Sequence, residues 1–335
     1  MAFYETIKLE KSMYGVSGKS FTQILEELDP SHNYAGTELE GLDAYQRQLK
    51  RFDIKVSGEN CDTVERFFQT SESAALFPEF VSRAVQQGID RVNQLSSLVA
   101  TVTKVASTDY RTITATDGQS VGSAVLEGAA LPETVIQNQA NLVPMKKHGR
   151  LIKSSYEALR FHKLDLFAVT LRQIGAEIAR EQIKEAVAVL INGDGNNNAA
   201  GTTALSAKPT YSDMLGLWGE IAPFELNTMA ASTATMQDLL GITEFKDAVA
   251  GLNFQGTGSI GTPMGADLIH VPGITDGVVL GLDKNCALEM VQAGDVLLDY
   301  DKLIDRQMEC ASVSTVCGFA KIYPDAVHAL TYTVS

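Results

Sequence analysis

The sequence predicts an α+β fold, because helical and strand-like patterns occupy separate stretches of the chain. Apolar residues recur at helical spacing over residues 164–191, whereas residues 98–145 show the alternation of strands. The chain has 335 residues and 45% of them are hydrophobic. It can therefore bury a large core, and it has room for two ordinary domains or one elaborated domain.

Composition and charge exclude several classes of protein. No run of 18 or more uncharged apolar residues exists, and the N-terminus MAFYETIKLEKSMYG lacks the basic-then-apolar order of a secretory signal. We therefore expect a soluble protein made in the cytosol, with no membrane partner. The formal charge of -14 disfavours broad affinity for nucleic acid. Four cysteines form no C-x-x-C pair and are expected to stay reduced, without a structural zinc: Cys61, Cys286, Cys310 and Cys317.

Residues 1–75 are predicted to form an N-terminal arm rather than a core. Ser20 is a candidate N-cap for the short helical stretch SFTQILEEL, a second helical pattern covers LEGLDAYQRQLKRF, and SGENCD interrupts the segment. A longer helix follows in ALFPEFVSRAVQQGIDRVNQL. Its apolar face carries Leu76, Phe80, Ala84, Val85 and Ile89.

The strand-like region is predicted to form a long hairpin that projects from the body. Its strand patterns are LVATVTKVA, then YRTITAT closed by Asp117 and Gly118, then TVIQNQANLVPM. Between them lies DGQSVGSAVLEGAALPE, which is small and glycine-rich and has too few large apolar residues for a core of its own.

Residues 164–191 are predicted to form one long helix after a capped turn at Ser154–Glu157. At about 1.5 Å per residue this helix spans roughly 42 Å, which suits a spine across a flat domain. Its apolar stripe follows Leu164, Phe167, Leu171, Ile174 and Ile178, and then moves to Ile183, Val187 and Leu190. The shift predicts that the two halves of the helix pack on different neighbours.

The opposite side of this helix has charges of both signs and is predicted to be a solvated or intersubunit surface. It carries Arg172, Glu177, Arg180, Glu181, Lys184 and Glu185.

The cluster NGDGNNN at the end of the helix is interpreted as a stop signal and turn. Asn192, Asp194 and Asn196 alternate as in a calcium loop, but Asn197 replaces the required Gly and Thr203 the required Glu. The carbonyls at a helix C-terminus also repel anions. Glycines such as Gly193 can adopt the left-handed conformation that ends a helix.

No other pattern indicates catalysis, a cofactor or a metal. GTGSIG at 256–261 fits G-x-G-x-x-G but leads into a loop, Thr262–Gly265, rather than a helix. Asp299 and Asp301 could hold a hard cation, but a solvated turn is the better interpretation. The histidines are scattered singly: His32, His148, His162, His270 and His328. We therefore expect a protein that is not an enzyme.

The order of several strings resembles the major capsid proteins of tailed bacteriophages with the Hong Kong 97-type fold. The strings are EGAALPE (127–133), LVPMKKHGRLIKSSYEALR (142–160), the long helix, NGDG (192–195), TMAASTATMQDLLGI (228–242), GADLIHVPGI (265–274), VLGLDKN (279–285) and YPDAVHALT (323–331). The resemblance covers about residues 75–335.

The resemblance implies an α+β shell subunit with four parts. The N-terminal arm would be 1–75 and the extended loop 106–141. The peripheral domain would comprise 76–105, 142–200 with the spine helix 164–191, and returning strands in 288–335. The axial domain would be 201–287, where acidic residues outnumber basic residues by nine to three.

The resemblance also implies the partners. They would be other copies of the chain in hexamers and pentamers, then portal, scaffolding or decoration proteins, and packaged double-stranded DNA contacted non-specifically. The protein would reside in the virion after synthesis in the host bacterial cytoplasm. Some members of the family crosslink a Lys of the extended loop to an Asn of a neighbour. This chain has no Lys between Ala106 and Ala140 and no Asn after Asn285, so that bond is not expected.

Intersubunit contacts are predicted at two places besides the charged helix face, on the extended loop and at a mixed-charge turn. The hairpin tip at Asp117, Gly118 and Gln119 is expected to lie over a neighbour's peripheral domain, with Glu127 on the same loop. The mixed-charge turn DYDKLIDRQ is expected where three capsomers converge. Its charged residues are Asp299, Asp301, Lys302, Asp305 and Arg306.

Two alternatives stay open at this point. An encapsulin-type bacterial nanocompartment shell shares the fold and would hold protein cargo. A nucleotide-dependent oxidoreductase, read from GTGSIG, is the enzyme alternative.

Overall fold

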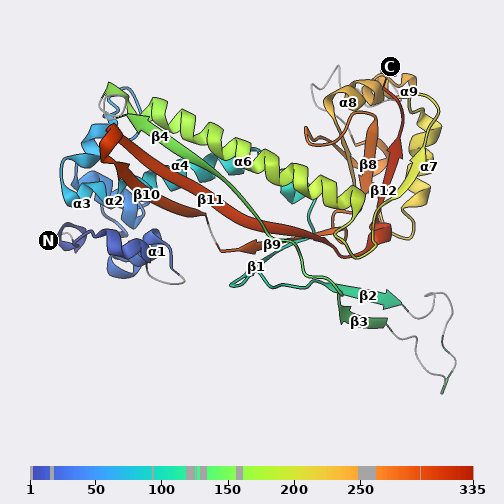
Figure 1. The fold of residues 1–335 in the computed structure, drawn as a ribbon, viewed down its shortest axis with the longest axis horizontal. Coiled ribbons are helices and arrows are strands. Elements are labelled where there is room, and N and C mark those ends of the chain that lie inside the picture. The colour runs from blue at the N-terminus through green and yellow to red at the C-terminus, as the bar shows by residue number, and fades with distance from the viewer. Residues whose placement is uncertain are drawn as a thin grey trace. The chain divides into compact units, whose positions relative to one another are not determined.

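A computed structural model describes residues 3–15, 19–92, 94–117, 125, 127–128, 134–155, 161–247, 262–294 and 296–334. The chain divides into two compact units. The first comprises Met1–Val92, Gly149–Ile178 and Val296–Ser314, and the second comprises Asn93–His148, Ala179–Asp295 and Thr315–Ser335. Helices and strands are both abundant, as the predicted α+β class requires (Figure 1).

The helices differ widely in length. The α-helices are α1 (Phe21–Leu28), α2 (Ala44–Arg51), α3 (Ser71–Ala74), α4 (Phe77–Val92), α6 (Leu164–Asn192), α7 (Tyr211–Glu220), α8 (Thr233–Leu240) and α9 (Thr243–Lys246). Short 3-10 turns are η1 (Phe3–Thr6), η2 (Lys11–Gly15), η3 (Ser31–Tyr34), η4 (Val64–Phe68), η5 (Leu95–Ser97), η6 (Pro263–Gly265), η7 (Ile304–Arg306) and η8 (Pro324–Ala326). No helix in the described residues is both long enough and apolar enough to cross a bilayer.

The strands form three sheets. They are β1 (Thr101–Val105), β2 (Ile113–Asp117), β3 (Thr134–Asn138), β4 (Lys146–Ser155), β5 (Gly201–Ala204), β6 (Thr228–Ala231), β7 (Asp267–His270), β8 (Val278–Leu282), β9 (Leu288–Ala293), β10 (Leu297–Leu303), β11 (Met308–Lys321) and β12 (Val327–Thr331). One sheet has the order β1-β9-β11-β10, with β4 also paired to β11; another has the order β5-β12-β8-β6-β7; the third is the β2-β3 hairpin.

The core of the first unit combines α1, α2 and α4 with the first half of α6. Close approach of α4 and α6 depends on glycine, because a Cβ on Gly88 would lie 2.0 Å from the carbonyl oxygen of Arg172. A Cβ on Gly175 would lie equally close to the carbonyl oxygen of Val85. The face predicted for α4 is buried in this core at Leu76, Phe80, Ala84 and Val85.

The expectation that residues 1–75 lack a core is wrong. Phe21, Leu25, Tyr45, Leu49 and Phe67 are buried in the same hydrophobic cluster as α4 and the first half of α6. Short helices such as α1 and α2 each bury only two or three apolar side chains, too few to indicate a core from the sequence. The core forms because several such helices pack together with α4 and α6.

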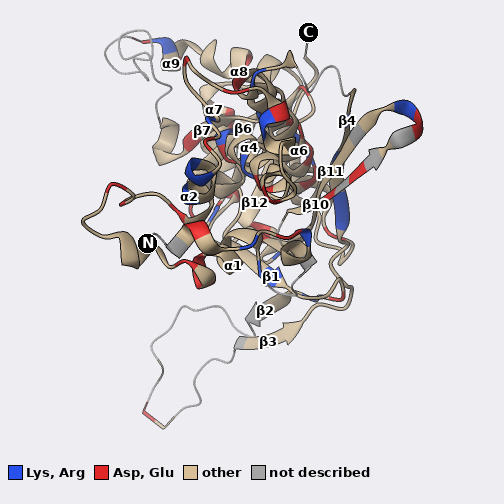
Figure 2. Cartoon of the chain, turned by 90° about the vertical axis from the view of Figure 1, so that its left-hand side faces the viewer, with Lys and Arg blue, Asp and Glu red and all other residues tan. Residues whose placement is uncertain are grey.

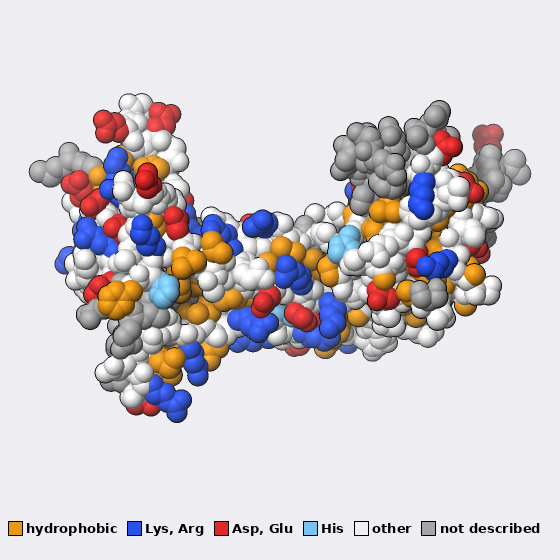
Figure 3. Space-filling view, turned by 90° about the horizontal axis from the view of Figure 1, so that it is seen from above, with side chains coloured by type: hydrophobic (Ala, Val, Ile, Leu, Met, Phe, Trp, Pro, Cys, Tyr) orange, Lys and Arg blue, Asp and Glu red, His pale blue; other side chains and the backbone are white. Residues whose placement is uncertain are grey.

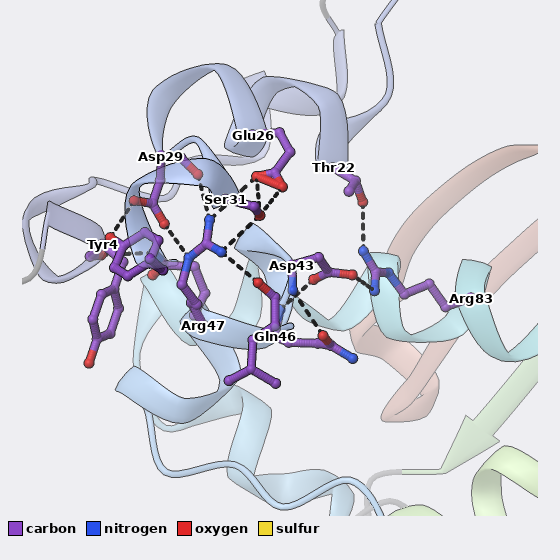
Figure 4. A network of polar contacts seen from close by, with 12 residues as sticks. Tyr4, Thr22, Glu26, Asp29, Ser31, Asp43, Gln46, Arg47 and Arg83 are labelled. Carbon is purple, nitrogen blue, oxygen red and sulfur yellow. Dashed lines mark hydrogen bonds and ion pairs between the residues drawn. The ribbon is translucent and has the colours of Figure 1, made fainter. Parts of the chain in front are cut away.

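Polar side chains fasten these short helices together. Arg47 on α2 is fully buried, its Nε lies 2.6 Å from Oδ2 of the equally buried Asp29, and its guanidinium lies 4.3 Å from the ring centre of Tyr34 (Figure 4). Asp43 caps the N-terminus of α2 and also accepts a hydrogen bond of 2.6 Å from Arg83 on α4. A buried charge is tolerated only when it is paired and hydrogen-bonded, so this network fixes α1 and α2 in one arrangement.

The second unit contains the second half of α6 and most of the strands. Ile183, Val187 and Leu190 are buried in one cluster with residues of β8, β9 and β11. Leu164, Leu171 and Ile178, earlier on α6, belong to the core of the first unit. The prediction that the two halves of this helix pack on different neighbours is therefore confirmed.

Two predicted turns differ from the structure. Ser154 and Ser155 are the last residues of β4 rather than part of a cap, and 156–160 lie outside the described residues. The stretch 299–307 is mostly strand, since β10 continues to Leu303 and only η7 and Gln307, with φ 51°, make the turn. Pairing with β11 extends the strand: Asp299 lies opposite Ser312 and Asp301 opposite Cys310.

Candidate assembly surfaces

The charged side of α6 forms ion pairs with β4 in each unit. In the first unit, Arg150 Nη2 lies 2.9 Å from Glu177 Oε2, and both side chains reach solvent. In the second unit, the carboxylate of Glu185 forms an ion pair with Lys146 at 2.9 Å and a hydrogen bond with His148 at 2.7 Å. Basic and acidic side chains stand side by side over this region, with hydrophobic ones between them (Figure 3).

Glu185 is an exception to the predicted solvated or intersubunit face. Its side chain is buried, and the pairing with Lys146 and His148 supplies the partners that a buried carboxylate requires. The other predicted positions remain at the surface: Arg172 and Glu177 are half-buried, and Arg180, Glu181 and Lys184 are exposed. The predicted charged side chains therefore reach the surface of this chain, except for the last acidic residue, Glu185, which is buried.

The β2-β3 hairpin is confirmed over its strands. Ile113 lies opposite Asn138 and Asp117 opposite Thr134 in antiparallel register. Ile113, Val135 and Ile136 are exposed, the last at 67% of its surface. β3 carries no charged side chain (Figure 2).

The exposed β-branched side chains on β2 and β3 form a surface that another protein chain could cover. Of the predicted tip, Asp117 is the last residue of β2, Glu127 is exposed, and Gly118 and Gln119 lie outside the described residues.

The base of the hairpin is held by a buried carboxylate. Glu289 on β9 accepts hydrogen bonds from the hydroxyls of Thr103, Tyr110 and Thr112, the Tyr110 bond measuring 2.9 Å. Thr112 is fully buried immediately before β2. Burial, and next the hydrogen bond to Glu289, raise the pKa of Tyr110 above its ordinary value, so Tyr110 stays a donor at neutral pH.

A second set of bonds joins the other strand of the hairpin to the end of α6. Gln139 lies directly after β3, and its side chain donates a hydrogen bond of 2.8 Å to the backbone carbonyl of Lys321. It also accepts a hydrogen bond of 2.8 Å from the side-chain amide of Asn196. The side chain of Asn141 donates to the carbonyl of Gly195 at 2.7 Å. Asp194 Oδ2 accepts from the backbone N–H of Lys321 at 2.9 Å.

These bonds define the role of the NGDGNNN cluster. Gly193 and Gly195 have φ of 83° and 95°, so α6 stops where predicted. The loop that follows also positions the hairpin, because its carboxylate and amides meet Gln139, Asn141 and Lys321. Sequence patterns cannot show this second role, since the partners lie 55 and 127 residues away along the chain.

The predicted mixed-charge turn lies at the end of the β10-β11 pair. Asp299 and Asp301 are exposed on β10, and Asp305 and Arg306 are exposed on η7, with Arg306 Nε 3.7 Å from Asp305 Oδ2. Lys302 belongs to β10, but its side chain is not among those that the structure describes. Asp305 and Arg306 thus lie at the turn between β10 and β11, whereas Asp299 and Asp301 are exposed along β10.

Within the described ranges, no group of three or more His, Cys, Asp or Glu side chains could hold a metal ion. The GTGSIG stretch at 256–261 lies outside those ranges. All four cysteines are free thiols.

Comparison with known proteins shows which proteins this chain is similar to. A family profile described as phage capsid protein matches residues 138–297. No curated protein matches the sequence.

Solved shell structures share the fold at low sequence identity. A virus-like particle from Pyrococcus furiosus is 14% identical, with 75% of this chain and 98% of that chain covered and a TM-score of 0.52. The capsid of cyanophage P-SCSP1u is 14% identical over 71% and 88% of the chains, with a TM-score of 0.52. The capsid of a native GTA particle is 15% identical over 74% and 90%, with a TM-score of 0.52. The fold is therefore that of phage-type capsid subunits, and the matched family is one of structural proteins, not of enzymes.

Proposed function

We propose that this chain, a phage-type capsid shell protein by its family match over 138–297 and by its fold, is the major capsid protein of a tailed bacteriophage. Copies of it would form the hexamers and pentamers of an icosahedral head around packaged double-stranded DNA. The observation that carries the proposal is the family match to phage capsid proteins, which includes the end of β3, the long helix and β9.

Within that shell the four-part division is also a proposal. The hairpin 106–141 would be the extended loop, and α6 would be the spine of a discontinuous peripheral domain. The axial domain would comprise 201–287, completed by β12, which pairs with β5 and β8. Residues 1–75 would be an arm that folds as a packed helical segment, as the network around Arg47 supports.

The contacts between copies follow from the exposed polar and apolar side chains described above. The hairpin tip around Asp117 would lie on a neighbour's peripheral domain. The charged side of α6 would meet an adjacent copy, and the β10-β11 turn at Asp305 and Arg306 would meet its counterparts where three capsomers converge. Individual exposed ion pairs contribute only about 0–1 kcal/mol, so the shell must be stabilised by a large buried contact area and by many such contacts.

An encapsulin-type compartment is the second candidate, and the likeness to the Pyrococcus furiosus virus-like particle favours it. The two functions differ in what the shell encloses. Isolation of the native particle, with nuclease-protected nucleic acid and co-purifying protein both measured, separates them. The phage proposal predicts protected double-stranded DNA, a nucleic-acid-free particle filled with one enzyme would establish the compartment, and the lack of any particle would contradict both.

A further inference from the structure

We propose that the end of α6 is completed by a bound water molecule, which accepts a hydrogen bond from the side-chain amide of Asn198. The site, called here the α6-end site, is formed by Asn198, Asp194, Lys321 and the last turn of α6. All of these residues belong to the second unit. The site is therefore a property of one chain and does not depend on the proposed shell function.

The side-chain amide of Asn198 is buried, and the chain fixes its orientation. Only 6% of the surface of this residue is exposed. Its Oδ1 accepts a hydrogen bond of 3.0 Å from the backbone N–H of Asp194. Turning the amide over would place two donors against each other, so the hydrogen-bond network itself assigns Oδ1 and Nδ2.

Nδ2 of Asn198 is a donor that needs an acceptor. No protein atom in the described part of the chain accepts a hydrogen bond from it, although Nδ2 is buried. An unbonded donor in this position is costly, because it has lost its hydrogen bonds to bulk water and gained none in return. Buried polar groups that the protein leaves without a partner are normally bonded to an ordered water.

A glycine allows the amide to lie directly against the end of the helix. A Cβ on Gly193 would lie 2.6 Å from Oδ1 of Asn198 and 2.9 Å from the backbone nitrogen of Ala199. The φ of Gly193 is 83°, a conformation that residues with a Cβ rarely adopt. The sequence therefore permits at this place the close approach that buries the Asn198 amide.

The last turn of α6 supplies acceptors for the hydrogens of the water. A carbonyl oxygen has two lone pairs, and the final carbonyls of a helix have no partner within the helix. Three of them accept one bond each from the chain: Val189 from the N–H of Gly193, Leu190 from Nζ of Lys321 and Ile191 from the N–H of Ala200. A water that accepts from Asn198 can therefore donate to a carbonyl of this turn.

Charge selects water over an ion. The buried carboxylate of Asp194 and the negative end of the helix dipole both disfavour an anion. A cation is disfavoured because Asn198 presents an N–H group and the ammonium group of Lys321 lies 3.2 Å from the carbonyl of Leu190. A small neutral molecule that both accepts and donates hydrogen bonds fits these groups, and water has this chemistry.

The α6-end site lies in the loop that positions the hairpin. Asn196 donates to Gln139 at 2.8 Å, and the carbonyl of Gly195 accepts from Asn141 at 2.7 Å. Asn198 holds the same loop through the N–H of Asp194. A water bound to Asn198 would therefore be part of the structure that fixes the hairpin base.

A high-resolution density map of the unmodified protein tests the proposal directly. We expect a peak about 2.7–3.2 Å from Nδ2 of Asn198 in every copy of the chain. Nδ2 bonded to a protein acceptor with no such peak would overturn the proposal. A peak that bromide replaces, when bromide is substituted for chloride, would also overturn it, because the ligand would then be an anion.

Nuclear magnetic resonance of the free subunit, labelled with ¹⁵N at asparagine, gives a second measurement. The side-chain amide protons of Asn198 should show cross-relaxation with water of the sign expected for a water that tumbles with the protein. Asn192 is the control, because it is exposed at the end of the same helix and should show only weak contacts with surface water. Asn198→Asp, which lacks these protons, assigns the signals.

An Asn198 amide without a water signal would contradict the proposal. If Asn198→Asp does not fold, the density map of the parent protein still decides. If the parent forms no particles, the shell function fails, whereas the measurement on the free subunit remains a test of the α6-end site.

Discussion

Lys321 is a buried cation at the point where the hairpin, α6 and β11 meet. Its Nζ donates to the carbonyl of Leu190 in the last turn of α6 at 3.2 Å. Burial lowers its pKa from 10.5 to about 8, although Asp194 and Asp325 oppose the shift. Between these values the unfolded chain binds more protons than the folded chain, so this residue makes stability rise with pH from about 8 to 10.5.

Replacing Lys321 with Met isolates this effect. The free energy of unfolding of the parent relative to Lys321→Met should increase by about 1–3 kcal/mol between pH 7.5 and 10, because the parent no longer buries a charge. Urea denaturation of free subunits at several pH values measures the difference. A difference that stays constant over this range would show that Lys321 keeps its ordinary pKa.

The charged residues of the β10-β11 turn give a second prediction at this scale. Lys302→Glu together with Arg306→Glu adds four negative charges per subunit, because each substitution changes the charge by two. If three capsomers meet here, repulsion multiplies across the copies, and shells should fail to assemble at low salt while the subunit stays folded. Light scattering at two ionic strengths tests this. Normal assembly of the double variant at low salt would place the turn away from such a junction.

At the scale of the element, the hairpin depends on how its base is held. Thr112→Val removes one of three hydroxyl donors to the buried carboxylate of Glu289. We expect a loss of about 1–3 kcal/mol of stability and faster hydrogen exchange in β2 and β3. Thr114→Val, two residues further on and partly exposed, is the matched control. Equal effects of the two substitutions would mean that the contact with Glu289 does not hold the hairpin.

The sequence predicts elements well where one periodic pattern is long. The pattern predicts a helix over 164–191, and α6 extends over Leu164–Asn192, since its apolar stripe continues for several turns. The β2-β3 strands were equally recognisable. The β10 strand cannot be recognised in the sequence, because DYDKL has the composition of a turn. It becomes a strand only by pairing with β11.

Contacts between distant residues explain the remaining differences. Glu185 belongs to a charged helix face in the sequence, and only the position of Lys146 and His148 on β4 shows why it is buried. Arg47 likewise has the pattern of a surface residue, yet it is fully buried against Asp29. The contacts between subunits stay predictions, because they depend on copies of the chain rather than on one chain.

At the scale of the whole molecule, cohesion without covalent bonds is expected. Burial raises the pKa of Cys286 and of Cys317 to about 12, so both thiols resist oxidation near neutral pH. Particles boiled in detergent without reductant should therefore run as a single band of 36.1 kDa. A ladder of multimers on the gel would reveal a crosslink between subunits.

The central claim is that this chain exists to associate with copies of itself. The exposed apolar side chains of the hairpin, Ile113, Val135 and Ile136, would be removed from water by a partner chain. Sedimentation velocity of the purified protein, with electron micrographs of the same sample, tests the claim most directly. We predict that most of the protein sediments as capsomers or large closed shells. A single 36.1 kDa species under native conditions would contradict the account.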